Sequence, residues 1–271
     1  VMTYSMLASI VKYPFESTLA GSHGKFGFFC SEKDIYRKIA DDLGIIRKSK
    51  PGEPLAYARH PLVYLVEAAD DICYEIMDIE DAHKLKILSF DETKDLLLGF
   101  FGENVKKSIE KRIVDEGITD DNEKVIYMRA CVIGKLENAC AQTFIDNEEK
   151  ILDGEFRGSL VDNIPEPQRT AYRRCTEVSK QKIYRSKPVL DVELSGFKIM
   201  ETLMEMMTEA AVYPDRFYSR QLIGRVSSQY DITAPDLDTR LMAVVDYISG
   251  MTDVYALDIY QKINGISLPI V

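Results

Sequence analysis

The stretch that decides the fold runs from His60 to Leu85 and reads HPLVYLVEAADDICYEIMDIEDAHKL. Its apolar residues recur at steps of three and four, which is the spacing of a helix face. These residues are Leu62, Leu65, Val66, Ala69, Ile72, Cys73, Ile76 and Ile79. Pro61 suits the first turn of a helix, because a backbone N–H at that position would have no acceptor within the helix. The stretch therefore predicts one long helix over 60–85.

Helical patterns continue on both sides of this stretch, and few segments show the β-branched alternation of strands. Ser31 is typical of a helix N-cap and Gly44 of a helix end, which predicts a helix over Asp34 to Leu43. Further helices are expected over 91–101, 104–116, 119–150, 168–184, 194–211 and 235–263. The expected fold class is therefore all-α, with at most a small β-hairpin at Glu155 to Val161, where the sequence alternates weakly.

Composition narrows the class of protein. The length of 271 residues allows one large domain or two modest ones, and 46% of the residues are apolar. No apolar run is long enough to cross a bilayer, and the first residues have no basic region ahead of a cleavage site. Five cysteines form no CxxC pair, so we expect reduced thiols, a cytoplasmic location and no membrane partner. A net charge of −10 argues against sequence-independent nucleic-acid binding as the main activity.

A stripe of polar side chains is expected along the helix over 60–85. Asp70, Tyr74 and Asp78 are spaced four residues apart, so they line one face of the helix. Asp70 has no lysine or arginine three or four residues away. Two carboxylates on either side of an aromatic hydroxyl could bind a metal ion and a sugar. A solvated face of an amphipathic helix is the ordinary alternative, and spacing alone favours it.

Short blocks of distinctive sequence are spread over nearly the whole chain. The strongest is Glu67-Ala-Ala-Asp-Asp-Ile-Cys-Tyr74 followed by Asp78-Ile-Glu-Asp-Ala82. The others are Lys12-Tyr-Pro14, Lys25-Phe-Gly-Phe-Phe29 with Ser31-Glu32, Arg59-His-Pro-Leu62 and Asp246-Tyr-Ile-Ser-Gly-Met-Thr-Asp253. In this order and spacing, the blocks resemble the deoxyguanosinetriphosphate triphosphohydrolase (dGTPase) family of HD-domain phosphohydrolases.

The resemblance implies hydrolysis of a deoxynucleoside triphosphate, with dGTP the expected substrate, to the deoxynucleoside and inorganic triphosphate. It implies a homo-oligomeric enzyme that uses a divalent metal, Mg²⁺ or Mn²⁺. Asp70 resembles the last aspartate of the metal site, Tyr74 the tyrosine that packs against the deoxyribose, and Asp78 the acceptor for the sugar 3′-hydroxyl. Contacts to the triphosphate or its surroundings are implied for Lys12, Tyr13 and Lys25.

The same resemblance implies that part of the site lies elsewhere. In the family, the metal-binding histidine, a His-Asp pair and the catalytic histidine and glutamate precede the Lys-Tyr-Pro segment, which here occupies 12–14. We therefore expect the C-terminal part of a longer enzyme, with no catalytic residue in this chain and no hydrolysis by the chain alone. Residues 1–110 would be the remainder of the HD catalytic domain, without its N-terminal metal-binding helices, and 111–271 a C-terminal helical region.

A second interpretation is a non-catalytic helical module that binds an effector or a partner. Seven positive charges lie within nineteen residues, and such a cluster could bind a dNTP effector, single-stranded nucleic acid or an acidic protein surface. They belong to Arg169, Arg173, Arg174, Lys180, Lys182, Arg185 and Lys187. A solvated helix face is again the ordinary alternative.

Overall fold

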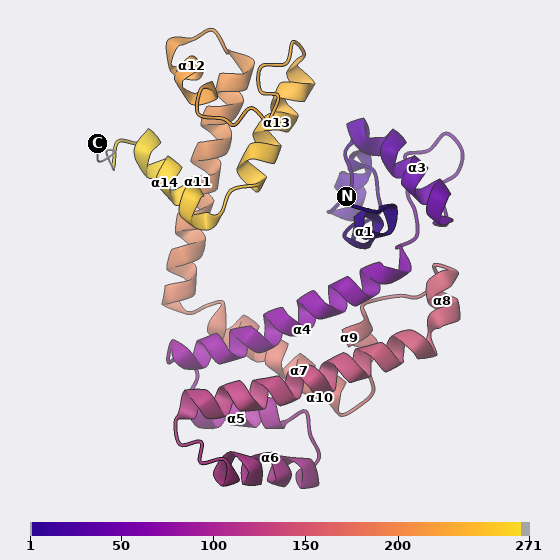
Figure 1. Cartoon of the computed structure of the whole chain (residues 1–271), viewed down its shortest axis with the longest axis vertical. Coiled ribbons are helices and arrows are strands. Elements are labelled where there is room, and N and C mark those ends of the chain that lie inside the picture. The colour runs from indigo at the N-terminus through magenta and orange to yellow at the C-terminus, as the bar shows by residue number, and fades with distance from the viewer. Residues whose placement is uncertain (1, 267–271) are drawn as a thin grey trace. The chain divides into compact units, whose positions relative to one another are not determined.

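The computed structural model describes residues 2–266, which form helices joined by turns and loops (Figure 1). Extended pairing in this range is limited to isolated bridges between Phe15 and Ala56, Glu16 and Phe28, and Arg47 and Tyr57. The prediction of an all-α fold is confirmed. The hairpin considered near residue 155 does not form, because Ser159 and Asp162 make a reciprocal cap that begins the short helix α9, Leu160–Asn163.

The chain divides into two compact units between Tyr184 and Arg185. The division expected at residue 110 falls inside helix α6, Glu103–Asp115, and one hydrophobic core includes side chains from both sides of it. The expected division into a catalytic part, 1–110, and a C-terminal helical region, 111–271, stays a prediction. Among the described residues, every helix is too short or too polar to cross a bilayer.

The first unit opens with a small lobe of short helices ahead of α4. They are α1 (Tyr4–Ser9), η1 (Ser17–Leu19), α2 (Ala20–His23), η2 (Cys30–Glu32) and α3 (Lys33–Leu43). Helix α3 ends as predicted at Gly44, whose φ of 67° lies in the left-handed region. Stacking of Phe28 on Tyr36, with ring centres 4.3 Å apart, forms the middle of the lobe's core.

The larger core of the first unit lies between α4 (Pro61–Lys84) and α7 (Asp121–Asp146), which run side by side (Figure 1). His60 caps α4 and Pro61 occupies its first turn, so the predicted helix is confirmed. The remaining elements are α5 (Phe90–Leu98), α8 (Glu148–Leu152) and α10 (Gln168–Val178), which continues into the π-helical turn η3 (Ser179–Ile183).

The apolar positions of α4 do not form the single buried face that their spacing predicts. Ile72, Ile76 and Ile79 are at most 2% exposed. Leu62, Leu65 and Val66, in contrast, are 37–44% exposed. The spacing pattern combined a buried face and an exposed face of α4 into one. Apolar residues on different sides of a helix can still follow one another at steps of three and four.

The second unit consists of α11 (Lys187–Val212), α12 (Phe217–Ile223), α13 (Leu237–Ser249) and α14 (Asp253–Ile263). Its core includes Leu203, Ala211 and Val244. The single helix expected over 235–263 is interrupted, because the hydroxyl of Thr252 accepts the backbone N–H of Tyr255 and starts a new helix.

Candidate functional site

The outer face of α4 carries the predicted polar stripe. Asp70 is exposed and has no hydrogen bond or ion pair to any described residue. The ring of Tyr74 is 64% exposed. Asp78, two turns beyond Asp70, is half-buried and accepts a hydrogen bond of 2.7 Å from the hydroxyl of Tyr184. The stripe is therefore not uniformly solvated, because its last carboxylate is held by a second element.

Tyr184 is the site residue that the sequence did not reveal. Burial raises the pKa of Tyr184 above its ordinary value, and the nearby Asp78 carboxylate raises it further. The hydroxyl therefore stays protonated and donates to Asp78. Burial also raises the pKa of Asp78, although the hydrogen bond from Tyr184 acts against this. Because 106 residues separate the two side chains, no local spacing could predict their contact.

A buried glutamate positions the segment that carries Tyr184. Glu75, one turn ahead of Asp78, accepts hydrogen bonds from Thr176 at 2.9 Å and Ser179 at 2.6 Å. The hydroxyl of Tyr172 donates to the backbone carbonyl of Asp71 at 3.0 Å. These bonds fasten α10 and η3 to α4. A glutamate among the buried apolar positions of α4 was the available signal, since such a residue requires partners.

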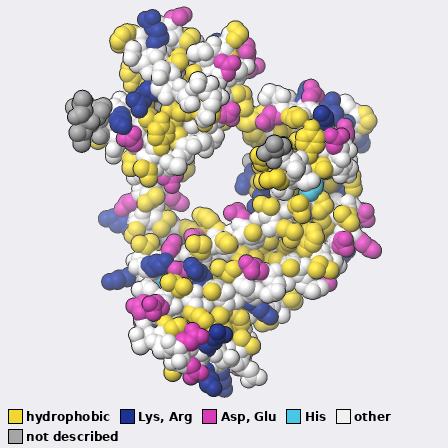
Figure 2. All heavy atoms as spheres, in the orientation of Figure 1, with side chains coloured by type: hydrophobic (Ala, Val, Ile, Leu, Met, Phe, Trp, Pro, Cys, Tyr) yellow, Lys and Arg dark blue, Asp and Glu magenta, His cyan; other side chains and the backbone are white. Residues whose placement is uncertain are grey.

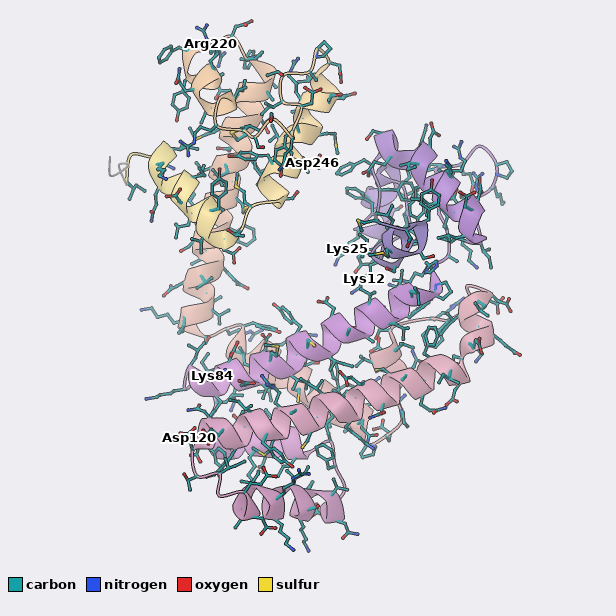
Figure 3. All side chains as sticks on the ribbon, in the orientation of Figure 1. Lys12, Lys25, Lys84, Asp120, Arg220 and Asp246 are labelled. Atoms are coloured by element: carbon teal, nitrogen blue, oxygen red, sulfur yellow. The ribbon has the colours of Figure 1, made fainter. Side chains whose placement is uncertain are left out.

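The predicted phosphate contacts lie together beside the N-terminal end of α4 (Figure 3). The ammonium of Lys25 lies 3.3 Å from the hydroxyl of Tyr13 and 5.1 Å from the centre of its ring. The ammonium of Lys12 lies 3.1 Å from a carboxylate oxygen of Glu67. Burial lowers the pKa of Lys12, but the hydrogen bond and charge of Glu67 outweigh it and the pKa is raised.

Arg59 and Glu67 fix the position of Lys12. The guanidinium of Arg59 lies 2.8 Å from Glu67, and its Nε donates to the backbone carbonyl of Lys12 at 3.1 Å. Glu67 is 8% exposed, so its charge is neutralised mainly by these two cations. Gly27 brings the segment of Lys25 against that of Tyr13, since a Cβ at position 27 would lie 2.2 Å from the Tyr13 carbonyl oxygen.

The described residues do not by themselves make a metal site. No group of three or more histidine, cysteine, aspartate or glutamate side chains among them could hold an ion. Asp70 offers one exposed carboxylate. The Nδ1 of His60 is already occupied, because it accepts the backbone N–H of Leu62 at 3.2 Å.

The basic cluster is partly neutralised. Arg169 pairs with Glu166 at 3.0 Å, and Lys182 pairs with Glu92. Three other members within the first unit are exposed and make no ion pair with a described residue. They are Arg173, Arg174 and Lys180.

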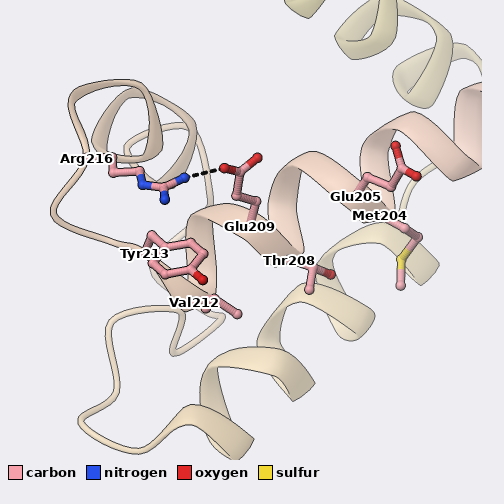
Figure 4. A pocket seen from close by; sticks show the side chains of 7 residues that line it. All are labelled: Met204, Glu205, Thr208, Glu209, Val212, Tyr213 and Arg216. Atoms are coloured by element: carbon pink, nitrogen blue, oxygen red, sulfur yellow. Dashed lines mark hydrogen bonds and ion pairs between the residues drawn. The ribbon is translucent and has the colours of Figure 1, made fainter.

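The block at 246–253 has both buried and exposed side chains. Tyr247 is 7% exposed and its hydroxyl lies 3.1 Å from that of Tyr255, whereas Asp246 points outward (Figure 3). The second unit also contains an open groove of about 620 Å³ (Figure 4). Within it Arg216 pairs with Glu209 and lies 4.0 Å from the ring centre of Tyr213, so the guanidinium of Arg216 already has partners.

Comparisons with known proteins show what the chain is similar to. Residues 163–262 match the phosphohydrolase-associated domain family. A deoxyguanosinetriphosphate triphosphohydrolase-like protein of Pseudomonas aeruginosa is 31% identical over 99% of this chain and 61% of its own length. One of Synechocystis is 32% identical over 98% of this chain and 60% of its own length. The deoxyguanosinetriphosphate triphosphohydrolase of Yersinia enterocolitica is 24% identical over 97% of the chain and 60% of its own length. The chain thus spans about three fifths of these relatives and matches their C-terminal part.

Proposed function

Since this chain is a relative of the dGTPase family over nearly its whole length, we propose that it supplies the nucleotide-binding part of an enzyme that hydrolyses dGTP. The products are deoxyguanosine and inorganic triphosphate. The chain by itself binds the nucleotide but does not hydrolyse it.

The order of groups along α4 carries this proposal. The cations Lys12 and Lys25 lie beside the N-terminal end of the helix, next to Glu67. Asp70 follows within one turn, and Asp78 lies about 12 Å beyond Asp70 along the helix axis. A deoxynucleoside triphosphate presents its groups in the same order, which is the phosphate chain, then the α-phosphate, then the sugar with its 3′-hydroxyl.

Each side chain has chemistry that suits its neighbour on the nucleotide. Lys12 stays cationic because Glu67 raises its pKa, and a lysine ammonium binds phosphate as a point charge. The exposed ring of Tyr74 offers a flat apolar wall to a deoxyribose. Tyr184 occupies one carboxylate oxygen of Asp78, and the other can accept a hydrogen bond from a sugar hydroxyl.

Asp70 is the ligand that we assign to this chain in a divalent metal site. Mg²⁺ or Mn²⁺ would neutralise phosphate charge and lower the pKa of a bound water. Because the described residues offer no further ligands around Asp70, we expect no release of triphosphate from dGTP by the chain alone. Metal-dependent release by the purified chain would contradict this assignment.

The binding proposal is tested by pairing a protein variant with a ligand variant. We expect Asp78→Ala to weaken dGTP binding about tenfold or more, the value of a hydrogen bond to a charged group. It should leave the binding of 2′,3′-dideoxy-GTP unchanged, because that ligand has no 3′-hydroxyl to donate. Asp81→Ala, which removes an exposed carboxylate paired with Lys84, is the matched control. Equal losses for both nucleotides in isothermal titration calorimetry would exclude Asp78 as the hydroxyl acceptor.

The unpaired part of the basic cluster supports a second proposal, a site for a dNTP effector or single-stranded nucleic acid. Arg173, Arg174 and Lys180 are exposed without ion-pair partners among the described residues, so their charges are available to phosphates. Binding of a thymidine oligonucleotide should fall steeply as salt is raised. Arg173→Ala with Arg174→Ala should flatten that slope by about one unit per lost contact. If the double variant did not change the salt dependence of binding, Arg173 and Arg174 would be excluded as phosphate contacts.

A further inference from the structure

The carboxylate of Glu67 has a separate cation at each of its two oxygens. The ammonium of Lys12 lies 3.1 Å from Oε1, and the guanidinium of Arg59 lies 2.8 Å from Oε2. Glu67 itself is 8% exposed, whereas the side chain of Lys12 is 36% exposed. Basic side chains reach the surface of the N-terminal lobe in Figure 2, where Figure 3 places Lys12 and Lys25 in the same orientation. Lys12 therefore connects a buried carboxylate with a surface that a solute can reach.

Arg59 is held more firmly than Lys12. Its Nε donates to the backbone carbonyl of Lys12, and its guanidinium carbon lies 5.5 Å from the ring centre of Tyr64. Tyr64 is buried, and its hydroxyl donates to the backbone carbonyl of Phe156 at 3.1 Å. The stem of a lysine is flexible, so the ammonium of Lys12 can move while the guanidinium of Arg59 stays beside Glu67.

The second cation matters because Lys12 has two possible partners. If Lys12 turned from Glu67 to a phosphate, Glu67 would keep a cation only through Arg59, and a buried charge without a partner is strongly unfavourable. An ammonium also has three N–H donors, so Lys12 could contact Glu67 and a phosphate together. Its attraction for the phosphate would then depend on how far Arg59 neutralises Glu67. Both arrangements require Arg59.

The balance of charge in this group leads to the same conclusion. The carboxylate of Asp71 also lies close enough to Lys12 for its charge to raise the pKa of Lys12. With Arg59 present, two cations balance the carboxylates of Glu67 and Asp71. Without Arg59, one cation would face two carboxylates, and the group as a whole would repel a triphosphate.

We propose that Arg59 is a positioning residue, which keeps Glu67 neutralised and so lets Lys12 present its ammonium to the phosphates of the nucleotide. This role rests on the function proposed above, in which Lys12 contacts the phosphate chain. It requires no contact between Arg59 and the nucleotide.

A double-mutant cycle on Lys12 and Arg59 tests this role, with dGTP binding to the chain measured by isothermal titration calorimetry. We expect Arg59→Gln, which removes the charge but keeps an N–H donor, to weaken binding about tenfold or more. In a chain that already carries Lys12→Ala, the same change should weaken binding less than about twofold, because Arg59 acts through Lys12. Arg37→Gln, which breaks an exposed pair with Asp34 in the same lobe, is the matched control.

A conservative variant separates the charge of Arg59 from its other contacts. Arg59→Lys keeps a positive charge beside Glu67 but loses the planar guanidinium that lies near Tyr64. It should bind dGTP more tightly than Arg59→Gln does. Circular dichroism verifies that each variant is folded, so that a loss of binding is not a loss of structure.

Three results would overturn the proposal. The first is an affinity for dGTP that Arg59→Gln does not change. The second is an equal loss with and without Lys12→Ala, which would show that Arg59 acts independently of Lys12. The third is an Arg59→Lys variant that binds as weakly as Arg59→Gln, which would assign the loss to structure and not to charge. If the unaltered chain binds no dGTP, the proposed function itself fails, and the role of Arg59 fails with it.

Discussion

The two compact units are stabilised in different ways. The first buries three carboxylates of α4, namely Glu67, Glu75 and Glu80. Each has a partner from another element, and that of Glu80 is Arg129 of α7. In the second unit, the only buried polar side chain among the described residues is Ser219. Burying a charge is costly unless it is paired, so the acids of α4 restrict which neighbours can pack against it.

The first unit relies on contacts between particular residues, whereas the second relies on the packing of an apolar core. Partners of the α4 acids come from the N-terminal lobe, from α7, from α10 and from the segment after it, so the helix holds distant segments in one arrangement. The second unit has a core of the ordinary apolar kind, which specifies volume and shape more than contacts between particular residues.

The largest expected loss of stability follows from shortening a buried side chain in the second unit. Leu203 is fully buried, so Leu203→Ala should lower the free energy of unfolding by about 2–5 kcal/mol. Leu194→Ala on the same helix is the control, because Leu194 is 68% exposed. Urea unfolding followed by circular dichroism measures both. If the two losses were similar, the apolar core would not be the main source of stability in this unit.

A somewhat smaller effect is expected when a buried charge in the first unit is removed. Glu67→Ala leaves Lys12 and Arg59 without their shared acceptor. It should lower the free energy of unfolding by about 3 kcal/mol. This is the low end for a broken buried pair, because both cations reach water. Glu201→Ala breaks an exposed pair with Lys198 in the second unit and should cost less than about 0.5 kcal/mol. Comparable losses in urea titrations of the two variants would remove the contrast between the units.

The smallest effect concerns how a helix begins in each unit. The neutral imidazole of His60 caps α4, and burial lowers the pKa of His60 below its ordinary 6.5. A lowered pKa means that this stability is fully present above pH 6.5 and is lost as pH falls through the folded-state pKa. The loss should be about 1 kcal/mol, the value of a helix cap.

Replacing the cap tests this directly. His60→Asn keeps a capping side chain that does not titrate, so the change in unfolding free energy between pH 7 and pH 5 should shrink relative to the unaltered chain. Thr252, which caps α14, does not titrate, and Thr252→Asn should leave the pH dependence as it was. An unchanged pH dependence in the His60 variant would show that other groups control it.

Much of the fold was predictable because helix signals are local. The limits of α4 and α3 were predicted within one residue from Pro61 and Gly44. The break between α13 and α14 was missed, since a threonine cap inside an apolar periodic stretch resembles a continuing helix. The exposure of Leu62 and Leu65 could not be read from spacing, because periodicity identifies an apolar face and not what covers it.

In the candidate site, too, the local features could be predicted from the sequence and the contacts between distant segments could not. Asp70, Tyr74 and Asp78 were placed together by their spacing on one helix, and their proposed roles stay predictions. Tyr184 and Asp78 meet across 106 residues, and Arg59 reaches Lys12 across 47. Such contacts arise only when distant segments fold against each other, so pattern reading along one sequence could not supply them.

Gly27 has a consequence for comparing natural variants of this protein. Alanine at that position would change no charge and remove no hydrogen-bonding group, so a similarity score would rate the exchange as conservative. Its methyl group would nevertheless occupy the space of the Tyr13 carbonyl oxygen and of a Val11 side-chain carbon. The exchange would push the segments of Lys12 and Lys25 apart without altering either lysine. In a homologue without glycine there, the proposed phosphate contacts should therefore lie differently relative to each other, however well its charged residues align.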